Sequence, residues 1–110
     1  MKLPNPNQAI IDSQKLSGYC LNPTHPDGQH KARVFRSTLG LTQADEQELC
    51  NALKAALIEY DAILEGENNY GKKYVIDFLM IKGDRQAVIH SVWIVRFTEE
   101  FPRLVSCYVL

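Results

Sequence analysis

Four side chains suited to acid–base and phosphate chemistry lie within the segment 22–35, NPTHPDGQHKARVF: His25, His30, Lys31 and Arg33. An imidazole gains and loses a proton near neutral pH, and lysine and arginine form strong charge-assisted hydrogen bonds to phosphate. This combination indicates an anion site, with a phosphate-bearing ligand as the first choice. The alternative is a structural loop whose basic residues are only solvated.

The elements around this segment decide what it can hold. Pro26-Asp27-Gly28 predicts a turn, because proline presets one dihedral and glycine permits a positive φ. A helix should then run from about Gln29 to Leu39, with Gly40 ending it as a left-handed residue. A helix start has free N–H groups and a partial positive charge, so it would reinforce Lys31 and Arg33.

Two further helices are expected. A short one should be capped by Asp12 or Ser13 and end before Pro23, whose ring cannot continue helical bonding. The other should start after Thr42, a good N-cap, and extend to about Tyr60, since apolar residues recur there at steps of three and four.

After Asp61 the apolar period changes from helical to alternating. AILEGE, KKYVIDFLMIK, AVIHSVWIVRF and RLVSCYVL read as four strands, with a hairpin turn at Gly83-Asp84-Arg85. Helices followed by strands predict an α+β fold, with two or three N-terminal helices packed on one face of a four-stranded antiparallel sheet. Residues 1–8 are expected to be an extended lead, and residues 9–110 a single domain.

Polar residues interrupt the predicted strands and mark a second group of candidates: Asp77, His90, Ser91, Ser106 and Tyr108. Ser106 and Tyr108 share one face of the last strand. Alternation separates Ser91 from His90, but the sequence leaves open which of the two faces the helices. For Asp77 and His90 a structural role, in a bulge or a satisfied hydrogen bond, is the simpler interpretation.

Several functional classes are excluded or disfavoured. The net charge of −1 excludes a globally basic nucleic-acid binder, although a local basic patch remains compatible with it. His25, His30 and Cys20 lack metal-ligand spacing, and there is no P-loop, dinucleotide fingerprint or hydrolase nucleophile motif. We therefore expect neither a metal nor another cofactor. Three widely separated cysteines predict a reduced, cytoplasmic protein, and no apolar run approaches the ~20 residues that span a bilayer.

A resemblance extends over residues 15–110. The pattern N-x-x-H-P-x-G-x-x-K-A-x-x-F, a tryptophan strand and the ending P-R-L-V-S-x-Y-V resemble an uncharacterised bacterial domain family associated with toxin–antitoxin and polymorphic-toxin systems. The order of helices and strands is also similar to that of the barnase/EndoU/RelE-like ribonuclease toxins, which is an analogy of fold.

The resemblance implies a metal-independent endoribonuclease of bacterial toxin type. The corresponding catalytic candidates are His25, Lys31, Arg96, Ser106 and Tyr108. His25 would act as base or acid and Lys31 as phosphate clamp. Arg96, or alternatively Arg103, would be a second cation, and Ser106 or Tyr108 would orient the substrate.

The competing hypothesis is a non-catalytic protein-binding module, in which the loop around His25 only fixes the helix start. Expected partners are RNA under the first hypothesis and a cognate antitoxin protein under either, with no membrane. A homo-oligomer is compatible with the apolar ending CYVL. The two hypotheses separate on whether His25 and Lys31 meet Arg96 or Ser106 across a hollow.

Overall fold

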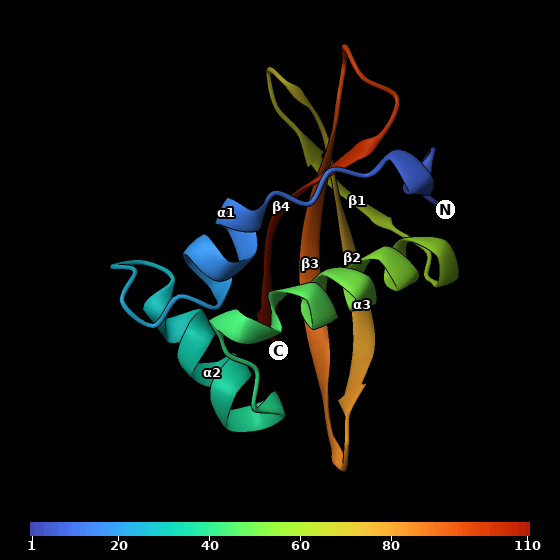
Figure 1. The fold of residues 1–110 in the computed structure, drawn as a ribbon. Helices are drawn as coiled ribbons and strands as arrows, with labels where there is room; N and C mark the ends of the chain where they lie inside the picture. Colours follow the sequence, from blue (N-terminus) through green and yellow to red (C-terminus); the bar gives the residue numbers. More distant parts are fainter.

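The computed structural model describes all 110 residues and shows a four-stranded antiparallel sheet with helices on one face (Figure 1). The strands lie in the order in which they occur along the chain, so each pairs with its sequence neighbour. The predicted α+β architecture is confirmed. The strands are β1 (Ile63–Glu67), β2 (Gly71–Lys82), β3 (Arg85–Arg96) and β4 (Pro102–Val109).

The helical layer is built from segments that begin and end where the capping residues predict. The Asp12 side chain accepts a hydrogen bond from the Gln14 N–H, and Thr42 and Asp45 form a capping box. Gly40 ends its helix in the left-handed region at φ 69°. The segments are η1 (Pro6–Gln8), α1 (Ser13–Lys15), η2 (Leu16–Cys20), α2 (Gln29–Leu39), η3 (Gln43–Asp45) and α3 (Glu46–Glu59). None of these helices has the length and apolar character needed to cross a lipid bilayer.

The core lies between the helices and the sheet, and Trp93 is at its centre with no exposed surface. Phe35 of α2 and Leu53 of α3 are also buried there. Ser91 faces the same side and is satisfied, because its Oγ accepts from Trp93 Nε1 at 2.9 Å and donates to the Ile76 carbonyl at 2.7 Å. Ser91 and Trp93 therefore face the helices, and His90 points to the opposite side.

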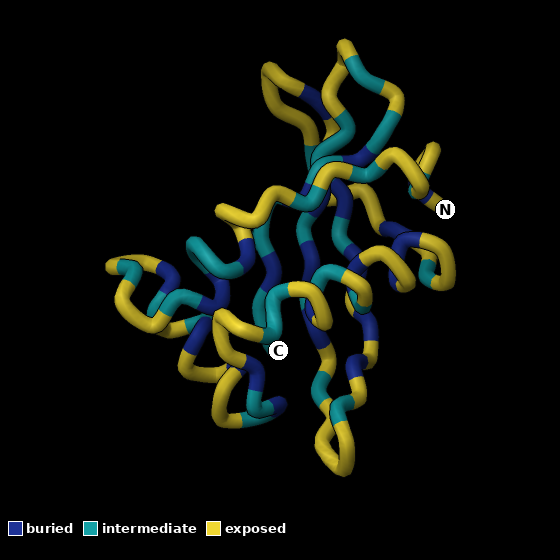
Figure 2. Tube along the Cα trace, in the orientation of Figure 1, coloured by how far each residue is buried: buried dark blue, intermediate teal, exposed yellow.

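The second face of the sheet carries no helix, and buried positions alternate along the strands with more exposed ones (Figures 1 and 2). We call it the open face. A register shift between Val92 and Trp93 inserts an extra residue in β4, which lets both Leu104 and Cys107 point into the core. Ser106 pairs with Val92 and Tyr108 with His90, so both lie on the open face.

The N-terminal residues pack against the domain. Leu3 is only 2% exposed, and Pro6–Gln8 forms a 3-10 turn where an extended lead was expected. Further on, Ile10 pairs in parallel with Arg103 and so covers part of the β4 edge. In Figure 1 this segment crosses one end of the sheet on the same side as the helices, and Leu3 joins the core there.

Candidate active site

A row of three polar side chains crosses the open face from β2 to β4. Asp77 is paired with His90, and His90 with Tyr108. Asp77 Oδ1 lies 2.7 Å from His90 Nδ1, and the His90 and Tyr108 rings lie 4.9 Å apart at 40°. We call Asp77, His90 and Tyr108 the polar row. It brings a carboxylate, an imidazole and a phenol into contact on a surface with no covering helix.

Lys31 reaches the polar row from the first turn of α2. Its Nζ donates a hydrogen bond of 2.7 Å to the Tyr19 hydroxyl and lies 5.9 Å from the centre of the Tyr108 ring. It also lies 4.5 Å from the Tyr19 ring. Cations are attracted to aromatic rings at such distances, so Lys31 is held between two phenols. The helix start and the terminal strand therefore approach each other at Lys31 and Tyr108, while the catalytic roles expected for these two residues stay predictions.

The imidazole of His25 extends this network away from the sheet, because its ring packs edge-on against Tyr19 at 4.9 Å. Its Nδ1 accepts hydrogen bonds from the backbone N–H groups of Asp27 and Gly28, each at 3.0 Å. A nitrogen that accepts two N–H groups carries no proton, so the ring proton is on Nε2. This geometry gives His25 an architectural role in the loop before α2.

His90 has the opposite arrangement. Its Nδ1 faces the Asp77 carboxylate, which accepts a hydrogen and so places the proton on Nδ1. In the neutral ring, Nε2 is then left with a free lone pair. The His90 side chain is 20% exposed, so that lone pair belongs to a partly accessible group. An imidazole oriented by a carboxylate is an arrangement that suits a general base.

Ser106 lies on β4 beside a pair of buried thiols. Its Oγ is 3.9 Å from Cys20 Sγ. Hydrogen bonds from Cys107 and Ser106, aided by the positive charge of Lys31, lower the pKa of Cys20 to about 7. The neighbouring Cys20 sulfur and burial raise the pKa of Cys107 well above its usual value. Both thiols have no exposed surface, so this cluster supports Ser106 from inside the domain.

Arg96 lies elsewhere on the open face. It is six residues along β3 from His90, which corresponds to about 20 Å of strand. Its Nε is 3.9 Å from Glu99 Oε1, and Arg103 binds the same carboxylate through two bonds of 2.7 and 2.6 Å. Together with Lys15, the two arginines line a hollow of ≈ 330 Å³ at this end of the sheet. Arg96 therefore does not join Lys31 at the polar row.

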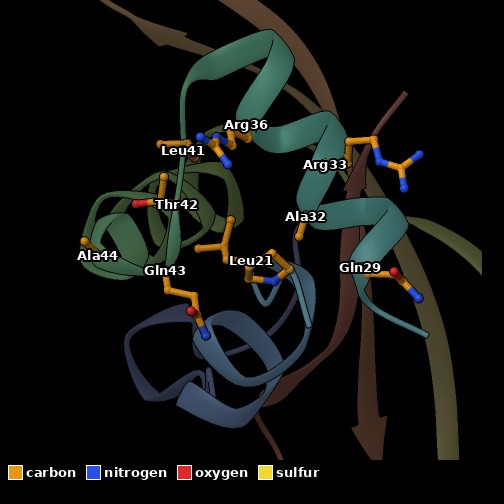
Figure 3. A pocket seen from close by; sticks show the side chains of 10 residues that line it. Leu21, Gln29, Ala32, Arg33, Arg36, Leu41, Thr42, Gln43 and Ala44 are labelled. Atoms are coloured by element: carbon orange, nitrogen blue, oxygen red, sulfur yellow. The ribbon is translucent and has the colours of Figure 1, made fainter. Parts of the chain in front are cut away.

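A second hollow, of ≈ 520 Å³, is also separate from the polar row (Figure 3). It lies between α2 and the segment 41–44, with Leu21 and Gln43 among its walls. Arg33 and Arg36 line it, and on a helical wheel they lie on the flank of α2 opposite to Lys31. Neither of these two hollows includes a residue of the polar row. No group of three or more His, Cys, Asp or Glu side chains is placed to hold a metal ion.

Comparison with protein families gives a match over residues 2–110 to DUF6883, described as a domain of unknown function. The chain belongs to the DUF6883 family. Among solved structures, it is similar to a chain of a contact-dependent growth inhibition toxin–immunity protein complex from Klebsiella pneumoniae 342, with a TM-score of 0.72 and 14% identity. The match covers 92% of this chain and 99% of that one, and at this identity it shows a shared fold. No curated protein matches significantly.

Asp77 and His90 were not foreseen as a pair from the sequence of this DUF6883 domain. A signal for them exists, since each is the polar residue that interrupts an apolar run in adjacent strands. The predicted turn at residues 83–85 was one residue too long. The observed turn has Lys82 opposite Arg85, and counting outward from it pairs 77 with 90. A three-residue turn would have paired Asp77 with Ser91, and such a one-residue slip exchanges the two faces of a strand.

Proposed function

We propose that this DUF6883 domain is a metal-independent endoribonuclease of bacterial toxin type, with His90 as its general base. The observation that carries the proposal is the contact between Asp77 and His90, 2.7 Å across β2 and β3, in one row with Tyr108 and within reach of Lys31. Cleavage of RNA is a reaction that an oriented base beside a cation can catalyse without a metal or cofactor, because the substrate carries its own nucleophile.

In the proposed step, His90 Nε2 removes the proton of a ribose 2′-hydroxyl. The 2′-oxygen forms a bond to the adjacent phosphorus, and the bond from phosphorus to the 5′-oxygen breaks. The Tyr108 hydroxyl donates a proton to the departing 5′-oxygen. The products are a 2′,3′-cyclic phosphate and a 5′-hydroxyl, and no oxidant, reductant or water is consumed. General acid–base catalysis of this kind contributes about 10²–10⁴ in rate.

Lys31 supplies the positive charge for the phosphate in the transition state. Its ammonium is already oriented by Tyr19 at 2.7 Å, so little reorganisation is needed when charge develops. Removal of one such donor costs about 10²–10³ in rate. Ser106, two residues along β4 from Tyr108, is assigned to orient the substrate, and His25 to hold the loop that positions Lys31.

The comparisons support a role in a toxin system. The similar structure comes from a complex of a toxin with its immunity protein, and the likeness extends over nearly the whole of both chains. By this analogy the domain would act on RNA and would be bound by a cognate antitoxin or immunity protein that covers the polar row. We propose the bacterial cytoplasm as the place where it acts, since RNA is there.

The test is a digest of total and transfer RNA by the purified domain in the presence of a chelator. The expected result is cleavage that survives the chelator and leaves 2′,3′-cyclic phosphate ends. His90→Ala should lose this cleavage while its circular dichroism spectrum shows the fold of the parent. Equal cleavage by His90→Ala and the parent, or intact RNA with the parent, would count against the proposal.

A second candidate function is protein recognition without catalysis. The observation in its favour is a group of apolar side chains that stay exposed on the open face: Leu79, Ile81, Val88 and Leu110. They are adjacent across three strands, next to the polar row. Exposed apolar clusters on a small domain commonly mark partner surfaces. The chelator digest separates the two candidates, because a recognition module leaves RNA intact at every concentration.

A further inference from the structure

The hollow of ≈ 330 Å³ at the far end of the open face has the composition of a ligand site. It forms where the N-terminal segment and α1 meet the ends of β3 and β4, and Tyr70 of the loop between β1 and β2 lines it. Its volume lies at the lower end of the range for small-ligand pockets, so it suits one unit of a polymer better than a large cofactor.

The cations of this hollow are only partly neutralised. Lys15 makes no ion pair, and Arg96 has one contact with Glu99 at 3.9 Å. Arg103 donates a short hydrogen bond to each carboxylate oxygen of Glu99, so the negative charge of Glu99 is neutralised mainly by Arg103. Asp12 lines the hollow as well, but its carboxylate accepts the Gln14 N–H as a helix cap. Lys15 and Arg96 therefore remain available to an anion.

The rest of the lining suits a flat apolar group. Ile94, Leu104 and Val105 are half-buried or buried and form apolar parts of the wall. Tyr70 is 72% exposed, although tyrosine rings usually pack. Proteins that bind single-stranded nucleic acids combine cations for the phosphates with aromatic rings on which bases stack. A phosphate matches the cations of this lining, and the base next to it matches the apolar and aromatic side chains.

The hollow and the polar row share one face of the sheet. Ile94 in its wall is four residues from His90 along β3, or about 14 Å. Lys73, paired with Ile94, adds another cation beside the hollow on the open face. A chain of phosphates leaving His90 along β3 would run from the site of cleavage toward increasing positive charge, in a protein whose net charge is only −1.

We infer that this hollow is a second substrate subsite, which holds one phosphate and its base of a single-stranded RNA a few nucleotides from the bond cleaved at His90. The inference rests on the proposed function. It makes Lys15 and Arg96 binding residues without a part in the chemical step. It also explains how a weakly acidic domain holds RNA, because the cations that matter are gathered on one face.

Binding is measured without cleavage, using His90→Ala as the background and a fluorescent single-stranded RNA of ten nucleotides in an anisotropy titration at several salt concentrations. Adding Lys15→Gln or Arg96→Gln should weaken binding several-fold. It should also lower the slope of log K against log salt by about 0.7 for each phosphate that the variant no longer binds. In the active domain, Arg96→Gln should raise KM and leave kcat within twofold, which is the signature of lost uniform binding.

The matched controls are Arg33→Gln and Arg36→Gln, which remove equal charge from the other hollow. Their affinity and salt slope should equal those of the background. A dinucleotide, too short to occupy both the polar row and the hollow, should be cut equally by the parent and Arg96→Gln. If the Lys15 and Arg96 variants bind like the controls while the parent cleaves RNA, the subsite is wrong and the proposed function stands. RNA that binds through Lys15 and Arg96 but is never cleaved would instead uphold this binding surface and overturn the proposed function, and absence of binding overturns both.

Discussion

His90 and His25 show opposite hydrogen-bonding patterns at the same ring atom. His90 Nδ1 faces the Asp77 carboxylate at 2.7 Å, whereas His25 Nδ1 accepts the N–H groups of Asp27 and Gly28 at 3.0 Å. The first pattern leaves Nε2 as a base in the neutral ring, and the second leaves Nε2 as an N–H donor. The two imidazoles are therefore not equivalent, and the candidate base is the one on the sheet.

Asp77 acts through His90, so its variants should affect turnover more than binding. Asp77→Ala should lower kcat by about 10- to 100-fold with KM nearly unchanged, because the imidazole loses the partner that orients it. Asp77→Asn keeps an oxygen acceptor and should retain more of the activity. Steady-state kinetics on a short RNA measure both values. A higher KM with unchanged kcat would instead indicate that Asp77 binds substrate.

His25 should contribute to stability. His25→Ala removes the acceptor of two loop hydrogen bonds, an exposed one from the Asp27 N–H and a part-buried one from the Gly28 N–H, and each such bond is worth about 0.5–1.5 kcal/mol. Urea denaturation followed by circular dichroism gives the free energy of unfolding. His30→Ala, at an exposed position of α2 without a side-chain hydrogen bond, is the matched control and should change it by about 0.5 kcal/mol or less. A fully stable His25→Ala with abolished cleavage would return His25 to the catalytic set.

Glycine is required at position 28 because the backbone of Tyr19 approaches it closely. Its φ is not in the left-handed region, so backbone conformation is not the reason. A methyl group at this position would collide with the carbonyl oxygen of Tyr19 and crowd its ring. Gly28→Ala should therefore destabilise the domain by about 1–3 kcal/mol, as overpacking does. Gly66→Ala is the control, because nothing lies within 4 Å of its added methyl. Thermal denaturation of both variants tests this, and an equal effect would show that the loop before α2 can move aside.

Glu46 should make the stability of the domain depend on pH in the acidic range. Hydrogen bonds from Ser13 at 2.5 Å and Ser17 at 3.0 Å lower the pKa of the Glu46 carboxyl. A pKa that is lower in the folded state gives stability that is present above the unfolded value of about 4.3. That stability is lost as the pH falls through the folded pKa. Glu46→Gln should flatten the acid side of a plot of unfolding free energy against pH, and an unchanged curve would show that the two serines contribute nothing.

Sequence patterns were sufficient for the elements and their order. Helix α2 begins at Gln29 and ends at Leu39 as predicted, because a turn and a glycine bracket it. The contact of Lys31 with Tyr108 was also anticipated, from a helix start and a terminal strand. These predictions depend on turn residues, helix caps and apolar periodicity, which can be read from neighbouring positions in the sequence.

The remaining errors come from geometry that local patterns do not contain. Pairing Asp77 with His90 required the turn length to within one residue, since the side-chain period of a strand is two. Arg96 was grouped with Lys31 because both are cations, although strand length places it about 20 Å along β3 from His90. Tyr19, which orients Lys31, lies on a short π-helical segment that periodicity does not foresee.

The most direct test of the proposed mechanism is single-turnover cleavage of RNA, in chelator, by the parent, His90→Ala and Lys31→Met. We predict a rate lower by about 10²–10⁴ for His90→Ala and by about 10²–10³ for Lys31→Met, with cyclic phosphate ends on the parent's products. Parental rates in both folded variants would contradict the mechanism, and so would RNA that the parent leaves whole.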